Sequence, residues 1–297
     1  MPTILIAGGT GLIGTRLSVL LSEKGHTVRL LTRHPKGDGQ FAWDPIQGTI
    51  DTAALQGVDA VVNLTGAGIA EKRWTQARKQ ELIESRVQSA AVLGKAIAAL
   101  AQGPKVYVSA AAIGYYGDTG EKVCREEDPP GKEGFLPECC IAWEKAAHGV
   151  SRPGLRTVVL RIGIVLAKEG GALKEIVNPL HFGLGTYFGD GRAWYSWIHR
   201  DDVCRQIIWA IENETVSGTF NAVAPNPVRN KTLIAMTAKA MGHWAVLSPV
   251  PAFALRLLFG QMADTILGST KVSAEKIEKA GFQYQYPELE HALRAIF

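Results

Sequence analysis

The chain opens with a short apolar run that leads directly into three glycines spaced three residues apart. Residues 3–7 form the run, Gly8, Gly11 and Gly14 follow, and an amphipathic stretch over 12–24 predicts a helix. A strand–turn–helix of this kind needs glycine where the turn is tight, where a phosphate approaches bare backbone and where the helix packs closely on the strand. The helix N-terminus then offers free N–H groups to a diphosphate. The pattern predicts nucleotide binding, and the alternative is a tight turn with a purely structural role.

The composition favours a globular protein with a large core. Of 297 residues, 46% are hydrophobic and 20% are charged, which allows one domain or two closely joined ones. A net charge of +4 without a long basic run gives no support to a nucleic-acid partner. No apolar run approaches the roughly 18–20 residues of a membrane span, so no membrane partner is expected.

Two further features indicate a cytoplasmic setting. The chain enters its first strand without the cationic and apolar segments of a secretory signal. The four cysteines, Cys124, Cys139, Cys140 and Cys204, lack metal-ligand and C-x-x-C spacing, so no metal site is expected. We expect the neighbours Cys139 and Cys140 to be buried helix residues rather than a redox pair, in a reducing compartment.

The end of the second predicted strand, 27–32, selects between the two nicotinamide dinucleotides. An NAD-specific site places a carboxylate there, which accepts a hydrogen bond from the ribose 2′-hydroxyl. This chain has Thr32 and Arg33 instead, and no carboxylate before Asp38. A guanidinium pairs doubly with phosphate oxygens, so we predict NADP, whose adenosine carries a 2′-phosphate. The alternative is a solvated surface arginine, with NAD as the cofactor.

Strands and helices alternate through the first half of the chain. Further strands are predicted at 41–43, 105–109 and 156–165, with one from residue 60 that runs into a small-residue loop, and helices at 74–101 and 138–150. This alternation predicts an α/β fold of the Rossmann type, a doubly wound parallel sheet. The small residues of the loop leave room for a ligand at the carboxyl edge of the sheet.

After Leu166 the pattern changes to glycine-rich turns and shorter helices, so we expect two units. Residues 1–166 form the NADP-binding Rossmann domain, and residues 167–297 form a smaller, partly helical C-terminal substrate lobe. A later strand near 219–223 is expected to return to the sheet of the first unit. The lobe would then cover the carboxyl edge of the sheet, where substrate binds.

Several short motifs occur together along the chain. They are Gly8-x-x-Gly11-x-x-Gly14, Asn63-Leu64-Thr65-Gly66, Ser109 through Tyr116-Gly117, Leu160-Arg161-x-Gly163-x-Val165-Leu166, Trp197-Ile198-His199-x-Asp201-Asp202 and Gly218-x-Phe220-Asn221. The set resembles the extended and atypical short-chain dehydrogenase/reductases, which include the nucleotide-sugar epimerases. More narrowly, the chain is similar to the YfcH-like epimerase-family proteins, whose marks are Ala70-Glu71-Lys72-Arg73-Trp74, Glu84-Ser85-Arg86, Tyr115-Tyr116-Gly117 and Trp143-Glu144. The segment after Pro225 resembles their C-terminal extension.

The resemblance implies an NADP-type cofactor and a set of residues that hold it. The set is Gly8, Thr10, Gly11, Leu12, Ile13, Gly14, Thr32, Arg33, Leu64, Thr65, Gly66, Glu81, Arg86, Ser109 and Val165. Glu81 and Arg86 depend on the resemblance alone, because charges on an amphipathic helix are ordinarily solvated. Ser109 fits a hydrogen-bonding role at a strand end better than that of a nucleophile, since no partnered base accompanies it.

The catalytic pair of the resembled enzymes is absent from this sequence. Those enzymes use Tyr-x-x-x-Lys, in which the lysine lowers the tyrosine pKa for proton exchange. No tyrosine here is followed four residues later by lysine. Matching Glu144 to the glutamate that trails the motif places Leu136 and Cys140 at the Tyr and Lys positions. The usual serine position falls near Ala111 or Ala112, so the ordinary proton relay is missing.

Two groups of side chains offer substitutes. Tyr115 and Tyr116 follow the fifth strand, where a substrate carbonyl or hydroxyl would lie near nicotinamide, although Tyr116 fits a packing role equally well. His199 precedes Asp201 and Asp202, and we expect it to act as a hinge or helix cap, with an acid/base cluster as the alternative.

We predict an NADP(H)-dependent oxidoreductase or epimerase-like protein that acts on a small carbonyl, hydroxyl or nucleotide-sugar-like ligand, as a monomer or homodimer. Its catalytic residues are not assigned by the sequence. The alternative is a catalytically silent NADP(H)-binding sensor or scaffold. An atypical nucleic-acid-associated protein is disfavoured by the mild charge and by the lack of a basic stripe.

Overall fold

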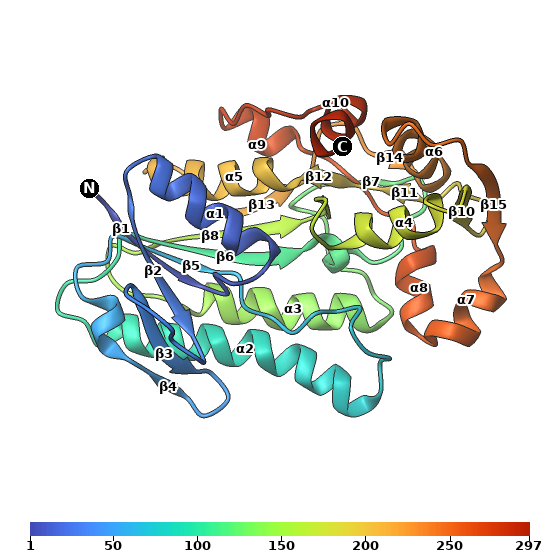
Figure 1. The fold of residues 1–297 in the computed structure, drawn as a ribbon. Coiled ribbons are helices and arrows are strands. Elements are labelled where there is room, and N and C mark those ends of the chain that lie inside the picture. Colours follow the sequence, from blue (N-terminus) through green and yellow to red (C-terminus); the bar gives the residue numbers. More distant parts are fainter.

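An eight-stranded sheet organises the computed structural model, which describes all 297 residues. The strand order is β4-β3-β2-β1-β5-β6-β8-β13 (Figure 1). These strands are β1 (Thr3–Ala7), β2 (Thr27–Thr32), β3 (Gln40–Asp44), β4 (Thr49–Ile50), β5 (Ala60–Asn63), β6 (Val106–Ala112), β8 (Arg156–Ile162) and β13 (Gly218–Ala222). All neighbours are parallel except β3 and β4, which form a short antiparallel hairpin. The chain builds outward from β1 first on one side and then on the other, so the predicted doubly wound Rossmann-type sheet is confirmed.

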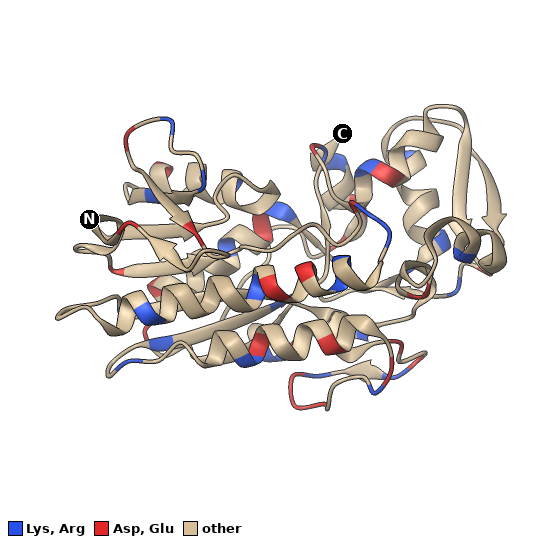
Figure 2. Cartoon of the chain, turned by 90° about the horizontal axis from the view of Figure 1, so that it is seen from below, with Lys and Arg blue, Asp and Glu red and all other residues tan.

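Two pairs of helices cover the two faces of this sheet (Figure 1). The pairs are α1 (Leu12–Glu23) with α5 (Arg200–Glu212), and α2 (Gln76–Ala98) with α3 (Phe135–His148). Each helix buries an apolar stripe at helical spacing, such as Leu17 and Leu21 in α1 and Leu93 and Ile97 in α2. Figure 2 shows Lys and Arg interspersed with Asp and Glu along the long helices of the lower face. No helix combines the length and the hydropathy that a bilayer span requires.

The predicted strand over 156–165 is wrong in one respect, because the chain forms two strands there. β8 ends at Ile162, and β9 (Ile164–Leu166) pairs instead with β12 (Trp197–His199). Gly163 marks the break, since a Cβ at this position would lie 2.5 Å from the Ser196 carbonyl oxygen and 2.8 Å from a Val223 methyl group. This close approach directs the chain out of the sheet and into a smaller lobe.

The smaller lobe has a core of its own with 13 buried residues. Its elements are α4 (Ala172–Leu180), β10 (Leu184–Phe188), β11 (Trp194–Tyr195), β14 (Val228–Arg229), α6 (Asn230–Ala240), β15 (Val246–Val250), α7 (Ala252–Phe259), α8 (Met262–Leu267) and α10 (Leu289–Ile296). Figure 1 places α4, α6, α7 and α8 beyond the carboxyl ends of the central strands. The unit boundary at residue 166 stays a prediction.

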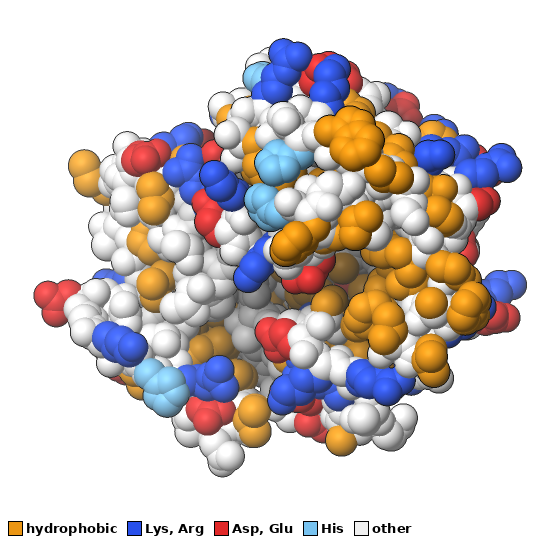
Figure 3. Space-filling model, turned by 45° about the vertical axis from the view of Figure 1, so that its right-hand side comes forward, with side chains coloured by type: hydrophobic (Ala, Val, Ile, Leu, Met, Phe, Trp, Pro, Cys, Tyr) orange, Lys and Arg blue, Asp and Glu red, His pale blue; other side chains and the backbone are white.

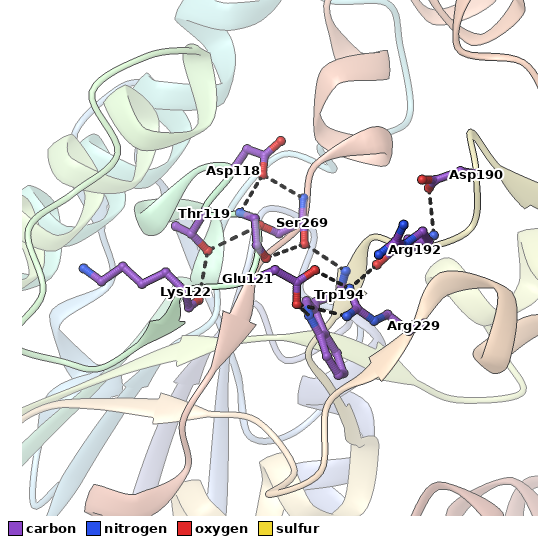
Figure 4. Close-up of polar contacts among 10 residues, drawn as sticks. Asp118, Thr119, Glu121, Lys122, Asp190, Arg192, Trp194, Arg229 and Ser269 are labelled. Atoms are coloured by element: carbon purple, nitrogen blue, oxygen red, sulfur yellow. Dashed lines mark hydrogen bonds and ion pairs between the residues drawn. The ribbon is translucent and has the colours of Figure 1, made fainter.

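Polar contacts join the loop after β6 to the C-terminal part of the chain (Figure 4). Asp118 accepts from the Ser269 N–H at 3.2 Å, and the Ser269 hydroxyl donates to the Gly120 carbonyl at 2.7 Å. Glu121 accepts two hydrogen bonds from Arg229, at 2.8 and 2.9 Å. Next to this junction β7 (Val123–Cys124) pairs with β16 (Lys271–Val272). The C-terminal segment is therefore part of the same folded body as the sheet.

The remaining short elements complete the chain. They are two 3₁₀ turns, η1 (Thr52–Leu55) and η2 (Ile113–Tyr116), and α9 (Glu275–Lys279). The four cysteines are all buried and none is bonded to another, as expected from the sequence.

The close contact between α1 and the turn after β1 gives a test of the fold. A Cβ at Gly14 would lie 2.4 Å from the Gly8 carbonyl oxygen and 2.6 Å from the Gly9 Cα. Overpacking of this kind costs about 1–3 kcal/mol, so we expect Gly14→Ala to lower the free energy of unfolding by that amount in urea denaturation. The control is Gly37→Ala, which meets no atom within 4 Å and should leave stability unchanged. Equal stability of the two variants would contradict the described packing of α1.

Candidate functional site

The glycine turn after β1 and the loop after β5 touch through their backbones. Gly8 has φ +82, and a Cβ there would lie 2.8 Å from the Leu64 carbonyl carbon. The N–H groups of Leu12 and Ile13 lie in the first turn of α1, where a helix has no internal acceptors. Because the chain reverses its direction of build-up between β1 and β5, this is the crevice at which open α/β sheets bind ligands.

Asn63 holds the loop after β5 in place. Its amide donates to the Ser89 hydroxyl at 3.2 Å and to the Tyr107 hydroxyl at 3.0 Å, and its side-chain oxygen accepts from the Thr65 N–H at 3.1 Å. The Thr65 hydroxyl oxygen is buried and has no partner within the chain. The crevice therefore contains a polar side-chain atom that the chain itself leaves unsatisfied.

Arg33 follows β2 and lines an open cavity of about 360 Å³ between β2 and the β3–β4 hairpin. The guanidinium is exposed and takes part in no ion pair or hydrogen bond within the chain. Two carboxylates, Asp44 and Asp51, also line the cavity, but backbone N–H groups of the neighbouring turns hydrogen bond to both. Thr32 accepts from the His34 N–H at 3.3 Å and shapes the turn. Arg33 is therefore the only cation that lines the cavity, beside two carboxylates, and its guanidinium is free to pair with a phosphate.

Arg86 lies beneath the loop after β5. It donates to the Ala67 carbonyl at 3.1 Å and to the Leu82 carbonyl at 2.7 Å, and its guanidinium stacks on the Trp143 ring at 4.7 Å. A Cβ at Gly66 would lie 2.9 Å from its central carbon. No carboxylate pairs with this buried cation, and burial lowers the pKa of Arg86. The residue supports the loop and carries an uncompensated positive charge next to the crevice.

The other predicted residues lie at different distances from the crevice. Val165 on β9 comes close to the glycine turn, because the Gly170–Gly171 segment packs on Leu12 and on the Val165 carbonyl. Glu81 forms an ion pair with Arg78 at 2.8 Å, and Arg78 also donates to the Gly68 carbonyl of the loop after β5. Ser109 is fully buried within β6 and donates to the Ala110 carbonyl at 3.1 Å. Thr10 is exposed at the turn itself.

A buried ion pair lies behind the crevice, between α3 and β8. Arg161 donates to both carboxylate oxygens of Glu144, at 2.7 and 2.9 Å, and to the Tyr116 hydroxyl at 2.8 Å. Tyr116 in turn donates to the Asn221 side-chain oxygen at 2.7 Å. Burial alone lowers the pKa of Arg161, but the hydrogen bonds and charge of Glu144 raise it above its ordinary value. Arg161 and Asn221 belong to two separate sequence motifs, and the spacing of these motifs does not indicate the network.

The network decides between the two roles considered for Tyr116. Burial raises the pKa of this phenol, and its hydroxyl is already engaged by two protein groups. Tyr116 therefore has a packing and bonding role. The hydroxyl of its neighbour Tyr115, by contrast, forms no hydrogen bond, and its half-buried ring stacks on Arg161 with the guanidinium carbon 3.5 Å from the ring centre.

The positions matched to the missing catalytic pair face η2. A Cβ at Gly114 would lie 3.2 Å from the Leu136 side chain and 3.4 Å from the Cys140 sulfur. Burial raises the pKa of the Cys140 thiol, so it stays protonated at neutral pH. Ala111 pairs in register with Arg161 on β8, and neither it nor Ala112 carries a polar side chain. None of these positions supplies a proton.

His199 acts as a helix cap, which confirms one of the two roles proposed for it. Its Nδ1 accepts from the Asp201 N–H at 3.1 Å at the start of α5. Asp201 accepts from two of the three guanidinium nitrogens of Arg16 on α1, Nε at 3.0 Å and Nη2 at 2.8 Å. Asp202 accepts from the backbone N–H groups of Gln285 and Tyr286, at 2.9 and 2.8 Å. The carboxylates thus join α1, α5 and the C-terminal segment, and they do not form an acid/base cluster.

The parallel sheet, the glycine turn at its switch point and the cation after β2 together define a protein of the short-chain dehydrogenase/reductase type. Residues 4–222 match the NAD dependent epimerase/dehydratase family, and residues 250–296 match a domain of unknown function, DUF1731. The chain therefore belongs to the NAD dependent epimerase/dehydratase family. The match over 250–296 confirms that the C-terminal segment is a distinct extension.

Individual relatives extend over nearly the whole chain. An epimerase family protein of Mycobacterium bovis is 37% identical over 292 residues, which cover 98% of this chain and 96% of the relative. The human epimerase family protein SDR39U1 is 35% identical over 296 residues, with 99% of both chains covered. A crystal structure of human SDR39U1 (isoform2) with NADPH has a TM-score of 0.92 at 34% identity and covers 99% of this chain and 98% of the human one. The predicted resemblance to epimerase-family proteins is confirmed.

The buried cap at α5 predicts how stability depends on pH. Burial lowers the pKa of His199 from 6.5 to about 4, against the opposing effect of Asp201. The unfolded chain therefore binds a proton below about pH 6.5, whereas the folded chain does not bind it until about pH 4. The free energy of unfolding consequently decreases as the pH is lowered through this window. We expect a loss of about 2 kcal/mol between about pH 7 and pH 5, measured by urea unfolding at each pH.

The control for this measurement is His199→Asn, which keeps a side-chain acceptor at the cap position but does not titrate. Its unfolding free energy should fall less between the same two pH values. A variant with the full pH dependence of the parent would show that the dependence arises elsewhere.

Proposed function

We propose that this protein binds NADP(H) in the crevice between β1 and β5 and acts as an oxidoreductase or epimerase-like enzyme on a small carbonyl, hydroxyl or nucleotide-sugar-like ligand. The observation that carries the proposal is the crevice itself. It combines a backbone cradle at Gly8 and Gly14 that any side chain would fill, an unpartnered buried hydroxyl at Thr65 and a free guanidinium at Arg33. The NADPH in the crystal structure of human SDR39U1 supports the choice of cofactor.

The residues of this chain have separate roles in the proposal. The first turn of α1 and the glycine turn would hold the diphosphate, Arg33 the 2′-phosphate, and Leu64 and Thr65 the middle of the dinucleotide. Val165 and Gly66 would line the crevice. Glu81 and Ser109 do not reach it in the described side-chain positions, so their contribution would be indirect. Arg86 would add a positive charge beneath the loop.

Bound NADPH supplies a hydride to a carbonyl carbon, and the carbonyl oxygen then needs a proton. Tyr115 is the proposed donor of this proton, because its hydroxyl is free while that of Tyr116 is occupied. Arg161 would hold the Tyr115 ring in position through the stacking contact, with Glu144 fixing Arg161 in turn. This arrangement would replace the Tyr-x-x-x-Lys relay by a single positioned phenol.

A second candidate is a catalytically silent NADP(H)-binding sensor or scaffold. The apolar packing of Leu136 and Cys140 on η2 favours it, because Leu136 has no titratable group and the buried Cys140 thiol keeps its proton near neutral pH. The two candidates share the cofactor and differ only in turnover.

The cofactor proposal is tested at Arg33. Loss of one doubly paired guanidinium–phosphate contact should weaken NADPH binding by about 2–4 kcal/mol in Arg33→Ala, and NADH binding should change little. Isothermal titration of both cofactors measures the difference. The control is Lys36→Ala, which removes an exposed cation from the same turn but not from the cavity. Equal losses for NADPH and NADH, or recovery of NAD rather than NADP from the purified protein by mass spectrometry, would refute the role of Arg33.

The catalytic proposal is tested with two tyrosine variants. Tyr115→Phe should reduce NADPH oxidation by about 10²-fold or more across a panel of carbonyl compounds, while stability stays near that of the parent. Tyr116→Phe should instead lower the free energy of unfolding by about 1–3 kcal/mol, since it leaves the Asn221 oxygen without its donor. Unchanged turnover in Tyr115→Phe would remove this residue from the mechanism. A parent protein that oxidises NADPH with no member of the panel would favour the sensor.

A further inference from the structure

The helix α7 exposes large apolar side chains where a surface helix ordinarily carries polar ones. Phe253 is 74% exposed, Leu257 77% and Leu258 63%, whereas Leu255 on the opposite side is buried. At 100° per residue the exposed side chains span about half of the helix circumference, and Arg256 is the only charge among them. One side of α7 packs on the lobe, and the other side is apolar but covered by nothing within the chain. Such an exposed apolar side marks a site of interaction with a second apolar surface.

A second group of exposed apolar side chains lies next to α7 along the chain. Phe182, Leu184, Trp244 and Val246 are all exposed at the start of the ribbon formed by β10 and β15. β15 leads into α7 through Pro251 alone. Figure 3 shows hydrophobic side chains gathered over this end of the molecule, beside a hollow in the surface. The ribbon that leads into α7 therefore carries a second apolar group at its starting end.

Positively charged side chains lie next to the last turn of α7. Arg73 donates to the Leu257 carbonyl at 3.3 Å, and Lys72 is exposed beside it. The acidic residues nearest in sequence to these cations, Glu71 and Glu81, both pair with the buried Arg78, at 3.1 and 2.8 Å. Lys72 and Arg73 are therefore left without carboxylate partners.

The remaining charges next to α7 do not reverse this sign. Arg256 forms an exposed ion pair with Asp264 at 3.3 Å, which leaves no net charge from that pair. Lys79, one turn into α2, contacts Gln261 just after α7 and carries a further positive charge. The edge of the apolar surface is thus basic.

From these observations we propose that α7 and the adjoining ribbon dock this protein reversibly on an anionic phospholipid bilayer. Exposed Phe, Leu and Trp side chains on a short helix, bordered by Lys and Arg, match the chemistry of an interfacial helix whose apolar face enters the boundary between headgroups and acyl chains. Lys72, Arg73 and Lys79 would lie among the anionic headgroups. Each Lys or Arg near such a surface contributes about 1 kcal/mol to the binding free energy. This docking is peripheral and needs no spanning helix, so it revises the expectation of no membrane partner, which rested on the lack of a long apolar run.

The shape of the surface favours a bilayer over a second copy of the chain. Figure 1 shows α7 at an outer corner of the molecule, away from the central sheet. A helix at an outer corner enters a fluid lipid surface readily, whereas an isologous dimer needs a self-complementary patch. The α7 surface also adjoins the loop after β5 through Arg73, so docking would bring the cofactor crevice close to the membrane.

The test is sedimentation of the full chain with vesicles of phosphatidylcholine, with and without phosphatidylglycerol. We expect binding to the anionic vesicles that weakens as salt is raised, and little binding to phosphatidylcholine alone. The double variant Phe253→Ser/Leu257→Ser should bind at least about tenfold more weakly, because it loses the apolar insertion. The matched control is Ile46→Ser, which removes an apolar side chain of similar exposure from the turn between β3 and β4.

A charge variant and a mass measurement complete the test. The double variant Lys72→Glu/Arg73→Glu should also bind anionic vesicles at least about tenfold more weakly, because it loses the attraction to the headgroups. Binding that is equal on neutral and anionic vesicles, or unaffected by both double variants, would overturn the proposal. A second outcome would also overturn it. In that case the parent binds no vesicles, light scattering shows that it is a dimer, and the Phe253→Ser/Leu257→Ser variant is a monomer. The assay needs no cofactor, so its result is independent of the proposed NADP(H) function.

Discussion

The crevice of this protein depends on the direct approach of two backbones at the centre of the sheet. The turn at Gly8 lies so close to the loop at Leu64 that a Cβ on Gly8 would clash with the Leu64 backbone. The lack of a side chain at Gly14 also lets α1 pack onto the same turn. Only this contact leaves the first N–H groups of α1 facing an open edge of the sheet. The loop keeps its shape because Asn63 is bonded to Ser89 and Tyr107. The floor of the crevice is therefore made of main chain, and side chains such as Asn63 support it from beneath.

A second constraint fixes the wall behind the crevice. Arg161 is buried with Glu144, and a buried ion pair is maintained only when its remaining donors are also satisfied. The Tyr116 hydroxyl and the Glu126 carbonyl meet that need, at 2.8 and 3.2 Å. Tyr116 is consequently not available for proton transfer, although its position in the sequence suggests it. The network converts a candidate catalytic residue into a support and leaves Tyr115 as the free phenol.

The sequence predicted those parts of the structure that depend on local pattern. The strand–turn–helix at the glycines, the alternation of strands and helices and the C-terminal extension are all predicted by short-range signals, and each is confirmed. The break at Gly163 was not predicted, because the run continues as apolar residues and only the distant Ser196 carbonyl makes a side chain impossible. The hydrogen-bond partners of Arg161 lie 17 to 45 residues away and those of Asp202 lie 83 to 84 residues away, and no spacing rule connects them. Long-range hydrogen bonds of this kind appear only in the folded chain.

Long-range hydrogen bonds also explain why Asp201 and Asp202, the paired carboxylates after His199, hold elements together and do not form an acid/base pair. An acid/base pair needs two groups that share a solvent-accessible site, whereas here the two side chains point to different elements. Asp201 binds Arg16 on α1, the helix whose N-terminus faces the crevice, and Asp202 binds the backbone just before α10. His199 caps the helix that carries both. One short segment thereby fixes the position of α1, whose N-terminus faces the crevice, relative to the C-terminal extension.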